Sequence, residues 1–123
     1  MQDTAGKISK VIKDFLNNTE VIDGVYVSSL DGLLVAHASR IDVDPDKVAA
    51  MITSISAVGD RVSKELLDEE STYVIVQAHT GYVIVRRQDN LIFSILVRAM
   101  DDAIMGFALL AFERLLDTIR NLK

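Results

Sequence analysis

The spacing of apolar residues changes several times along the chain, and each change marks the start of an expected element. Apolar positions first recur every three or four residues, from a cap at Asp3 or Thr4 to a polar stop at residues 17–19, which predicts an amphipathic helix. The period then shortens to two, as in a strand. Asp31-Gly32 interrupts this alternation, and Asp-Gly favours a tight turn because glycine tolerates positive φ. Residues 23–38 are therefore predicted to form a β-hairpin.

A long middle helix is predicted next. Asp44 is placed to cap it, and Pro45 occupies the first helical position, where its missing N–H has no cost. The helix is expected to end at the acidic cluster of residues 68–70. An apolar stripe along it is expected to face the core, formed by Val48, Met51, Ile52, Ile55, Val58, Val62 and Leu66.

A second stripe on the middle helix points in a roughly opposite direction. Its members cluster within about 40° of a common direction around the helix axis, and they are Ala50, Thr53, Ser54, Ala57 and Arg61. Four of the five are small and uncharged, whereas a solvated face normally carries Lys, Glu and Arg. Two interpretations remain open. The stripe is either an ordinary exposed face rich in good helix formers, or a surface for close contact with another helix, which we favour.

Three strands and a final helix complete the chain. The strands are predicted at residues 73–76, 82–85 and 91–97. Such continuous β-branched runs are typical of strands buried on both faces, so helices are expected on both sides of the sheet. Asp101 and Asp102 are expected to cap a last helix that runs to Leu122. The order α-β-β-α-β-β-β-α with its short turns predicts an α+β fold with a five-stranded, mostly antiparallel sheet and three helices.

Composition narrows the classes of function. The chain has 123 residues, half of them hydrophobic, and is predicted to form one domain over residues 1–123. It contains no Cys, which excludes a disulfide scaffold, a thiol nucleophile and a Cys-based metal site. The net charge of −5 argues against nonspecific binding to nucleic acid or to an anionic membrane. No stretch is apolar enough for membrane insertion and no secretory signal is evident, so a cytoplasmic protein is expected.

No catalytic, metal or cofactor site is predicted. The phosphate-binding loop and the dinucleotide motif are both absent. Residues 42–46 resemble the start of a calcium loop, but Lys47 stands where that loop requires Gly. His37 and His79 lack partners at ligand spacing, and Ser28-Ser29 lacks the glycines of a nucleophile elbow. By its own motifs the chain is therefore not expected to hydrolyse nucleotides.

The element order, together with the segment from Gly24 to Ala36, resembles the Roadblock / dynein light chain family. In that family a short opening helix precedes a strand, an Asp-Gly turn and a second strand. A long middle helix, a three-stranded meander and a C-terminal helix follow. The resemblance covers nearly the whole chain and rests on the order and lengths of the elements together. It implies that the middle helix covers one face of the sheet and the two terminal helices cover the other.

The resemblance also implies dimers that pair the middle helix, and the strand after it, across a two-fold axis. In this chain the strand within residues 72–78 would then be a hydrophobic sheet edge without Pro or Lys, which proteins rarely leave exposed. Pairing with a second copy would cover it. We therefore predict a homodimer whose interface includes Ala50, Thr53, Ser54, Ala57, Thr72, Val74 and Val76.

Members of this family are non-catalytic scaffolds or regulators of small Ras-like GTPases, or adaptors in motor complexes. The bacterial members that regulate a cell-polarity GTPase are similar in architecture. The resemblance thus implies a homodimeric scaffold that binds a small GTPase, and we expect Asp60, Arg61 and Lys64 to contact it. Two alternatives stay open. One is a small-molecule sensor domain, although the predicted interior offers few polar groups to orient a ligand. The other is an adaptor subunit of a motor or membrane-associated complex.

Overall fold

The structure, a computed structural model, describes residues 4–98 and 101–122. Its elements follow the order α1 (Thr4–Asn17), β1 (Ile22–Ser29), β2 (Leu34–Ser39), α2 (Pro45–Leu67), β3 (Val74–Ala78), β4 (Gly81–Gln88), β5 (Leu91–Val97) and α3 (Asp102–Arg120). Neighbouring strands are antiparallel throughout. The predicted α+β fold and its element order are confirmed.

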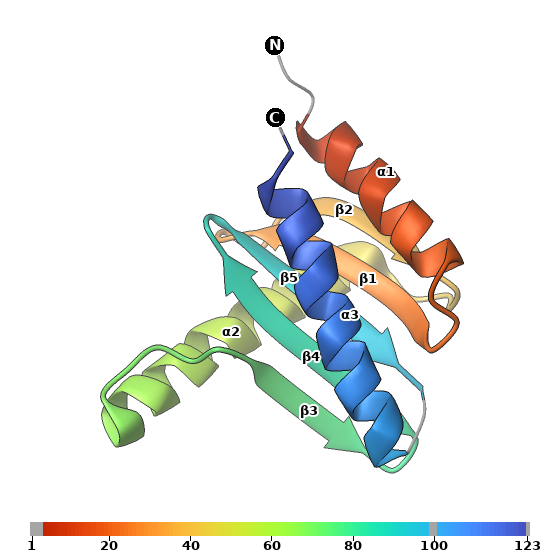
Figure 1. Cartoon of the computed structure of the whole chain (residues 1–123). Coiled ribbons are helices and arrows are strands. Elements are labelled where there is room, and N and C mark those ends of the chain that lie inside the picture. Colours follow the sequence, from red (N-terminus) through yellow and green to blue (C-terminus); the bar gives the residue numbers. More distant parts are fainter. Residues whose placement is uncertain (1–3, 99–100, 123) are drawn as a thin grey trace.

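The five strands form one sheet in the order β2-β1-β5-β4-β3. The pairing of β1 with β5 joins the first hairpin to the later meander, and it brings together strands that are far apart in the sequence. Helices α1 and α3 lie on one face of the sheet, and α2 lies on the other (Figure 1). This is the layer arrangement that the family resemblance implied. Strand β3 consequently forms one edge of the sheet.

Local sequence explains where two of the helices begin. Before α2, Asp44 has an extended backbone, and its Oδ1 accepts a hydrogen bond from the Asp46 backbone N–H at 3.0 Å. Before α3, the Asp101 Oδ1 accepts from the Ala103 backbone N–H at 2.9 Å. Each carboxylate satisfies a donor that the helix start leaves free, a contribution of about 1 kcal/mol. Both predicted caps are therefore present.

The two faces of the sheet are covered unequally. The larger core lies under α1 and α3, and it includes the fully buried rings of Phe93 and Phe112. On the α2 side, a much smaller buried cluster consists of Tyr26, Ile52, Val85 and Ile92. Helix α2 crosses the sheet obliquely and its C-terminal end extends beyond it (Figure 1). Part of the sheet face on this side is consequently not covered by any helix of the described residues.

Helix α2 meets the sheet through small residues. Its buried positions are Ala49, Ile52 and Ser56. Gly59 lies so close to β3 that an added Cβ would stand 2.3 Å from the Val74 Cγ2 atom. Because these small residues allow a close approach, the helix turns them inward and its larger side chains outward.

The expected inward stripe of α2 is therefore largely wrong. Of its seven members only Ile52 is buried, while Val48 and Ile55 are partly covered. The other four are 52–77% exposed, and they are Met51, Val58, Val62 and Leu66.

A polar cluster fastens α3 to the β3–β4 hairpin. The Tyr73 hydroxyl donates a hydrogen bond to the Glu113 carboxylate, and the Arg86 guanidinium donates to the same carboxylate. Arg86 also donates to the Tyr73 hydroxyl at 3.1 Å and lies over the Tyr73 ring, 5.1 Å from its centroid. The hydrogen bond from Tyr73, reinforced by the charge of Arg86, holds the pKa of Glu113 below its ordinary value.

Replacing Glu113 with Gln is expected to lower the free energy of unfolding by about 1 kcal/mol at neutral pH. The effect is small because the Glu113 side chain is 44% exposed and solvent screens the ion pair. Since the pKa is lowered in the folded state, the stabilisation is present above the unfolded pKa and is lost as pH falls through the folded pKa. Urea unfolding of both proteins over a pH series measures this. A difference that stays constant down to strongly acidic pH would contradict the assignment.

Two helical glycines form a matched pair for testing the close approach of α2. Ala in place of Gly within a helix normally stabilises by about 1 kcal/mol. We expect that gain for Gly106→Ala, because an added Cβ at Gly106 meets nothing within 4 Å. Gly59→Ala should instead cost roughly 1–3 kcal/mol, because the new methyl overlaps Val74. Urea unfolding in dilute solution distinguishes the two, and equal gains would mean that α2 lies farther from β3.

Candidate functional site

An exposed apolar stripe runs along α2. Its residues follow one another at intervals of three or four positions, close to the spacing of the a and d positions in a coiled-coil seam. We call this stripe the α2 seam, and it consists of Met51, Ile55, Val58, Val62 and Leu66. A helix surface of this kind is suited to packing against a second helix.

Strand β3 lies beside the α2 seam as the exposed edge of the sheet. It pairs only with β4 in the described sheet, so its other side has no strand partner. Ile75 and Val76 are 44% and 43% exposed, and Val74 is partly covered by α2. The strand sequence contains neither a Pro nor a charge that would discourage another strand from pairing. The edge position expected for this strand is confirmed.

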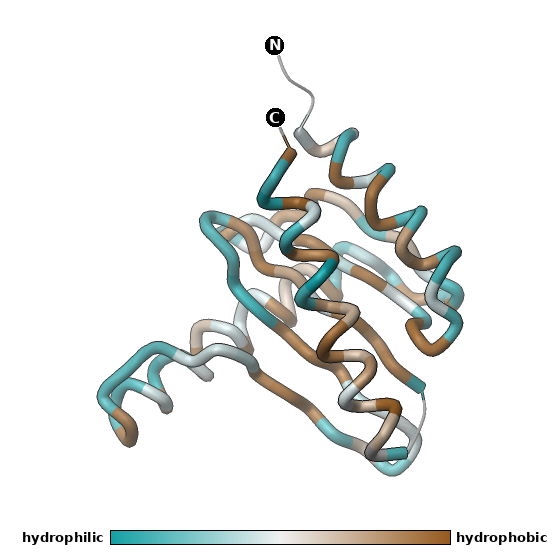
Figure 2. Tube along the Cα trace, in the orientation of Figure 1, coloured by the Kyte–Doolittle hydropathy of each residue, from teal (hydrophilic) through white to brown (hydrophobic). Residues whose placement is uncertain are grey.

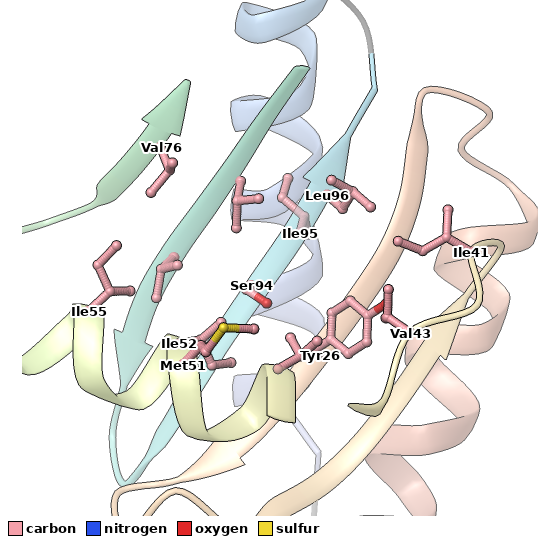
Figure 3. Close-up of a pocket in the computed structure, with 13 residues that line it drawn as sticks. Tyr26, Ile41, Val43, Met51, Ile52, Ile55, Val76, Ser94, Ile95 and Leu96 are labelled. Carbon is pink, nitrogen blue, oxygen red and sulfur yellow. The ribbon is translucent and has the colours of Figure 1, made fainter. Parts of the chain in front are cut away.

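An apolar pocket of about 310 Å³ opens between α2 and the uncovered part of the sheet. Figure 3 shows Met51 and Ile55 of the α2 seam on one side of it, with Val76 of β3 nearby and Leu96 of β5 across the floor. The polar side chains in its lining are Tyr26 and Ser94. The α2 seam, the pocket and the β3 edge thus form one continuous apolar surface.

The predicted interface residues of α2 divide into two groups. Ala50, Ser54 and Ala57 are exposed on the outer side of the helix, next to the α2 seam. Thr53 lies on the inner side instead. Its Oγ1 is 2.8 Å from the Ser28 Oγ of β1 and donates to the Ala49 carbonyl at 2.8 Å. Thr53 thus anchors α2 to the sheet of its own chain.

The predicted interface residues near β3 also have different surroundings. Thr72 is exposed just before the strand. Val74 packs against the small cluster under α2, and Val76 lines the apolar pocket. The structure therefore brings Val76 together with Met51 and Ile55, while Thr72 lies toward the C-terminal end of α2.

The three residues expected to contact a partner differ in the hydrogen bonds and ion pairs that they make within their own chain. The Asp60 Oδ1 accepts hydrogen bonds from the Ser71 backbone N–H at 3.2 Å and from its hydroxyl at 2.5 Å, which ties α2 to the segment before β3. Arg61 is exposed. The Lys64 Nζ lies 3.6 Å from Glu70 in an exposed ion pair, which contributes little to stability and is easily exchanged for another partner.

Sequence reasoning assigned the α2 seam to the core, so it missed the seam as a surface. The sequence nevertheless contains a pattern that indicates which side of α2 faces the sheet. A second run with the same three-and-four spacing, displaced by one residue, consists of Ala49, Ile52, Ser56, Gly59 and Ser63. Small residues at these positions indicate a close helix–sheet contact, which leaves the neighbouring larger residues outside.

Among the described residues, this face carries few groups suited to metal binding or acid–base catalysis. In residues 4–98 and 101–122, no group of three or more His, Asp or Glu side chains could hold a metal ion. None of the helices in that part of the chain combines the length and the apolar content needed to cross a membrane. The groups with raised or lowered pKa values, Tyr73, Arg86 and Glu113, lie elsewhere, in the cluster that joins β3 and β4 to α3. The face formed by α2 and β3 is thus suited to apolar contact.

Solved structures with similar folds include several bacterial proteins. MglB of Myxococcus xanthus superposes with a TM-score of 0.80 at 13% identity, over 95% of this chain and 87% of that chain. The gliding protein MglB of Thermus thermophilus gives 0.77 at 15%, over 94% and 87%. A Roadblock/LC7 domain from Streptomyces avermitilis gives 0.76 at 18%, over 91% and 93%. At these identities the likeness shows the fold alone.

A search of curated proteins gave no match. The family model for the Roadblock/LC7 domain, in contrast, matches residues 9–97. This stretch begins within α1 and ends with the last residue of β5, so it includes the whole sheet, α2 and the exposed β3 edge. The chain therefore belongs to the Roadblock/LC7 family, as its resemblance in sequence predicted.

Proposed function

We propose that this protein is a non-catalytic, homodimeric scaffold that binds a small Ras-like GTPase. The observation that carries the proposal is the continuous apolar surface formed by the α2 seam, the pocket and the β3 edge. Contiguous exposed apolar patches on a protein surface mark sites of interaction. Membership of the Roadblock/LC7 family supports a regulatory or adaptor role over a catalytic one.

The first step of the proposal is that a second copy covers this surface. Antiparallel pairing of β3 with the β3 of a partner chain joins the two sheets and satisfies the free backbone groups of both edges. The same two-fold axis brings the two α2 seams together, so that each packs apolar residues against the other. Ala50, Ser54 and Ala57 would lie at the margin of this contact, where their small size allows the helices to approach closely.

The second step is that the paired α2 helices present a platform to the GTPase. Arg61 and Lys64 remain exposed in the single chain, and both lie on the C-terminal half of α2. Asp60 contributes indirectly, because its bonds to Ser71 fix the segment next to them. Regulation would then follow from a difference in affinity between the two nucleotide states of the GTPase. The catalytic groups for hydrolysis would belong to the GTPase itself.

A sensor function has less support from the same pocket. Ligand pockets usually combine an apolar lining with a few polar groups that orient the ligand. Here the Tyr26 hydroxyl already donates to the Ser39 hydroxyl at 2.8 Å, which leaves Ser94 as the other polar side chain in the lining. We therefore assign the pocket to the protein–protein surface.

A substitution that introduces a charge into the α2 seam tests whether this seam forms the dimer interface. At low micromolar concentration, light scattering should give twice the 13.6 kDa mass of one chain for the unmodified protein. Val62→Glu should weaken dimerisation by roughly a hundredfold, because pairing would bury an unpaired carboxylate at a cost of several kcal/mol. Val62 is exposed in the single chain, so the fold itself should persist.

The matched control is Leu33→Glu, at a 68% exposed leucine in the turn between β1 and β2. This variant should dimerise like the unmodified protein. A monomeric unmodified protein at all concentrations, or equal effects of the two variants, would count against the α2–β3 interface.

GTPase binding is tested with the small Ras-like GTPase encoded nearest in the genome. Calorimetry with GDP or a non-hydrolysable GTP analogue should show tighter binding in one nucleotide state. Arg61→Glu should weaken that binding roughly tenfold, the effect of losing about 1.4 kcal/mol. Lys10→Glu, an equal charge change on the exposed side of α1, should not. Negligible binding in both states would refute this step while leaving the dimer intact.

A further inference from the structure

The N-terminal half of α3 is apolar on every side. Residues 103–112 contain no charged or strongly polar side chain. Figure 2 shows this change along α3, from apolar colouring near β3 to teal toward its C-terminal end. A helix that packs on one side only normally carries polar residues on the other. The outer side of this half of α3 therefore lacks the composition of a solvated surface.

Two large side chains on this outer side are uncovered. Phe107 and Leu110 are each 52% exposed, whereas Ala108 and Phe112 on the inner side are fully buried. Ala103 and Gly106 are also exposed there, and an added Cβ at Gly106 would meet nothing within 4 Å. Within the described chain, nothing around Gly106 requires a glycine, although glycine weakens a helix interior. Its lack of a side chain would, however, allow another helix to lie close.

We propose that this outer face of α3 binds the same face of a second copy, with the two α3 helices antiparallel around a two-fold axis. The residues of the contact, which we call the α3 face, are Ala103, Gly106, Phe107, Leu110 and Arg114. Successive members lie one to four positions apart, and they share one side of the helix. A two-fold axis between Phe107 and Leu110 places each Phe107 against the partner's Leu110, so each large side chain meets a large apolar neighbour.

Charge at the two ends of the α3 face specifies a second copy as the occupant. Asp101 is exposed before the first turn, and Arg114 is exposed at the other end. The antiparallel arrangement brings Arg114 of each chain beside the first turn of the partner's α3, within reach of the acidic cap. Opposite charges at opposite ends of an apolar stripe make this surface complementary to itself. The same acidic end, together with the net charge of −5, disfavours an anionic membrane as the occupant.

The α3 face is separate from the surface assigned to the proposed dimer. Helix α3 and helix α2 cover opposite faces of the sheet (Figure 1). Both contacts can therefore form at once, and together they would join two dimers into a tetramer or extend them into a longer assembly. The α3 contact does not depend on the α2–β3 contact, so each can be removed without the other.

Sedimentation velocity from low micromolar to submillimolar concentration tests the α3 contact. Gly106→Leu is the main variant, because the free space around Gly106 and the better helix propensity of Leu should leave the melting temperature of the fold unchanged or raised. We expect the unmodified protein to reach twice the mass of the Gly106→Leu variant at high concentration. Leu110→Glu should have the same effect by placing a charge in the contact. Equal masses for all three proteins would overturn the proposal.

Combination with the α2 variant separates the two interfaces. If both exist, Gly106→Leu stops at two chains, Val62→Glu also stops at two chains, and the double variant is a monomer. If only the α3 contact exists, Val62→Glu changes nothing and Gly106→Leu gives a monomer. If only the α2–β3 contact exists, Gly106→Leu changes nothing and the inference drawn here is wrong.

Cross-linking tests the antiparallel arrangement. The chain has no Cys, so each introduced thiol is unique. In the antiparallel pair, the two copies of residue 110 stand about 4.5 Å apart along the helix axes and the two copies of residue 103 about 16 Å apart. A short bismaleimide should therefore join Leu110→Cys chains and leave Ala103→Cys chains unjoined. Equal cross-linking at both positions would indicate parallel helices and would contradict the charge argument, and cross-linking at neither would refute the contact.

Discussion

The distance between α2 and the sheet determines which side chains this protein exposes on its α2 side. Ala49, Ser56 and Gly59 have too little side chain to keep the helix at the usual distance, and the Gly59 backbone lies directly against Val74. This contact fixes the rotation of α2 about its axis. Once the small residues face inward, geometry requires the larger residues of the α2 seam to face outward or sideways, toward β3. The same close contact between α2 and the sheet thus creates the exposed apolar surface of the α2 seam.

The unequal covering of the two sheet faces follows from this close contact. On one face, α1 and α3 provide large side chains such as Phe112, and the core there is well filled. On the other face, a single helix set close to the sheet can cover only a narrow band. The uncovered remainder is lined by β3, β4 and β5, and it becomes the apolar pocket beside the sheet edge. The pocket therefore results from the absence of a second helix on this face within the described part of the chain, whereas the free edge results from the strand order, in which β3 pairs only with β4.

The sequence predicted those features that depend on neighbouring residues. Element order and the caps Asp44 and Asp101 follow from local patterns, and the structure contains them. The pairing of β1 with β5 is long-range, and only the family resemblance suggested the layers. The rotation of α2 was misjudged because two stripes with equal spacing differ by one residue, and the more hydrophobic one was taken as the core. The bonds that Thr53 and Asp60 make within the chain could not be predicted from local patterns, since their partners Ser28 and Ser71 are 25 and 11 residues away.

The polar cluster of Tyr73, Arg86 and Glu113 links the two sides of the molecule. Tyr73 lies directly before β3, so the cluster holds the start of the edge strand to α3, while Asp60 holds the preceding Ser71 to α2. The edge strand is therefore fixed from both layers before any partner binds. A preorganised edge loses less conformational entropy on pairing than a mobile one. Rigidity of β3, combined with its lack of charge, therefore favours strand pairing over fluctuating contact, and it gives the apolar surface beside it a fixed shape for a partner to match.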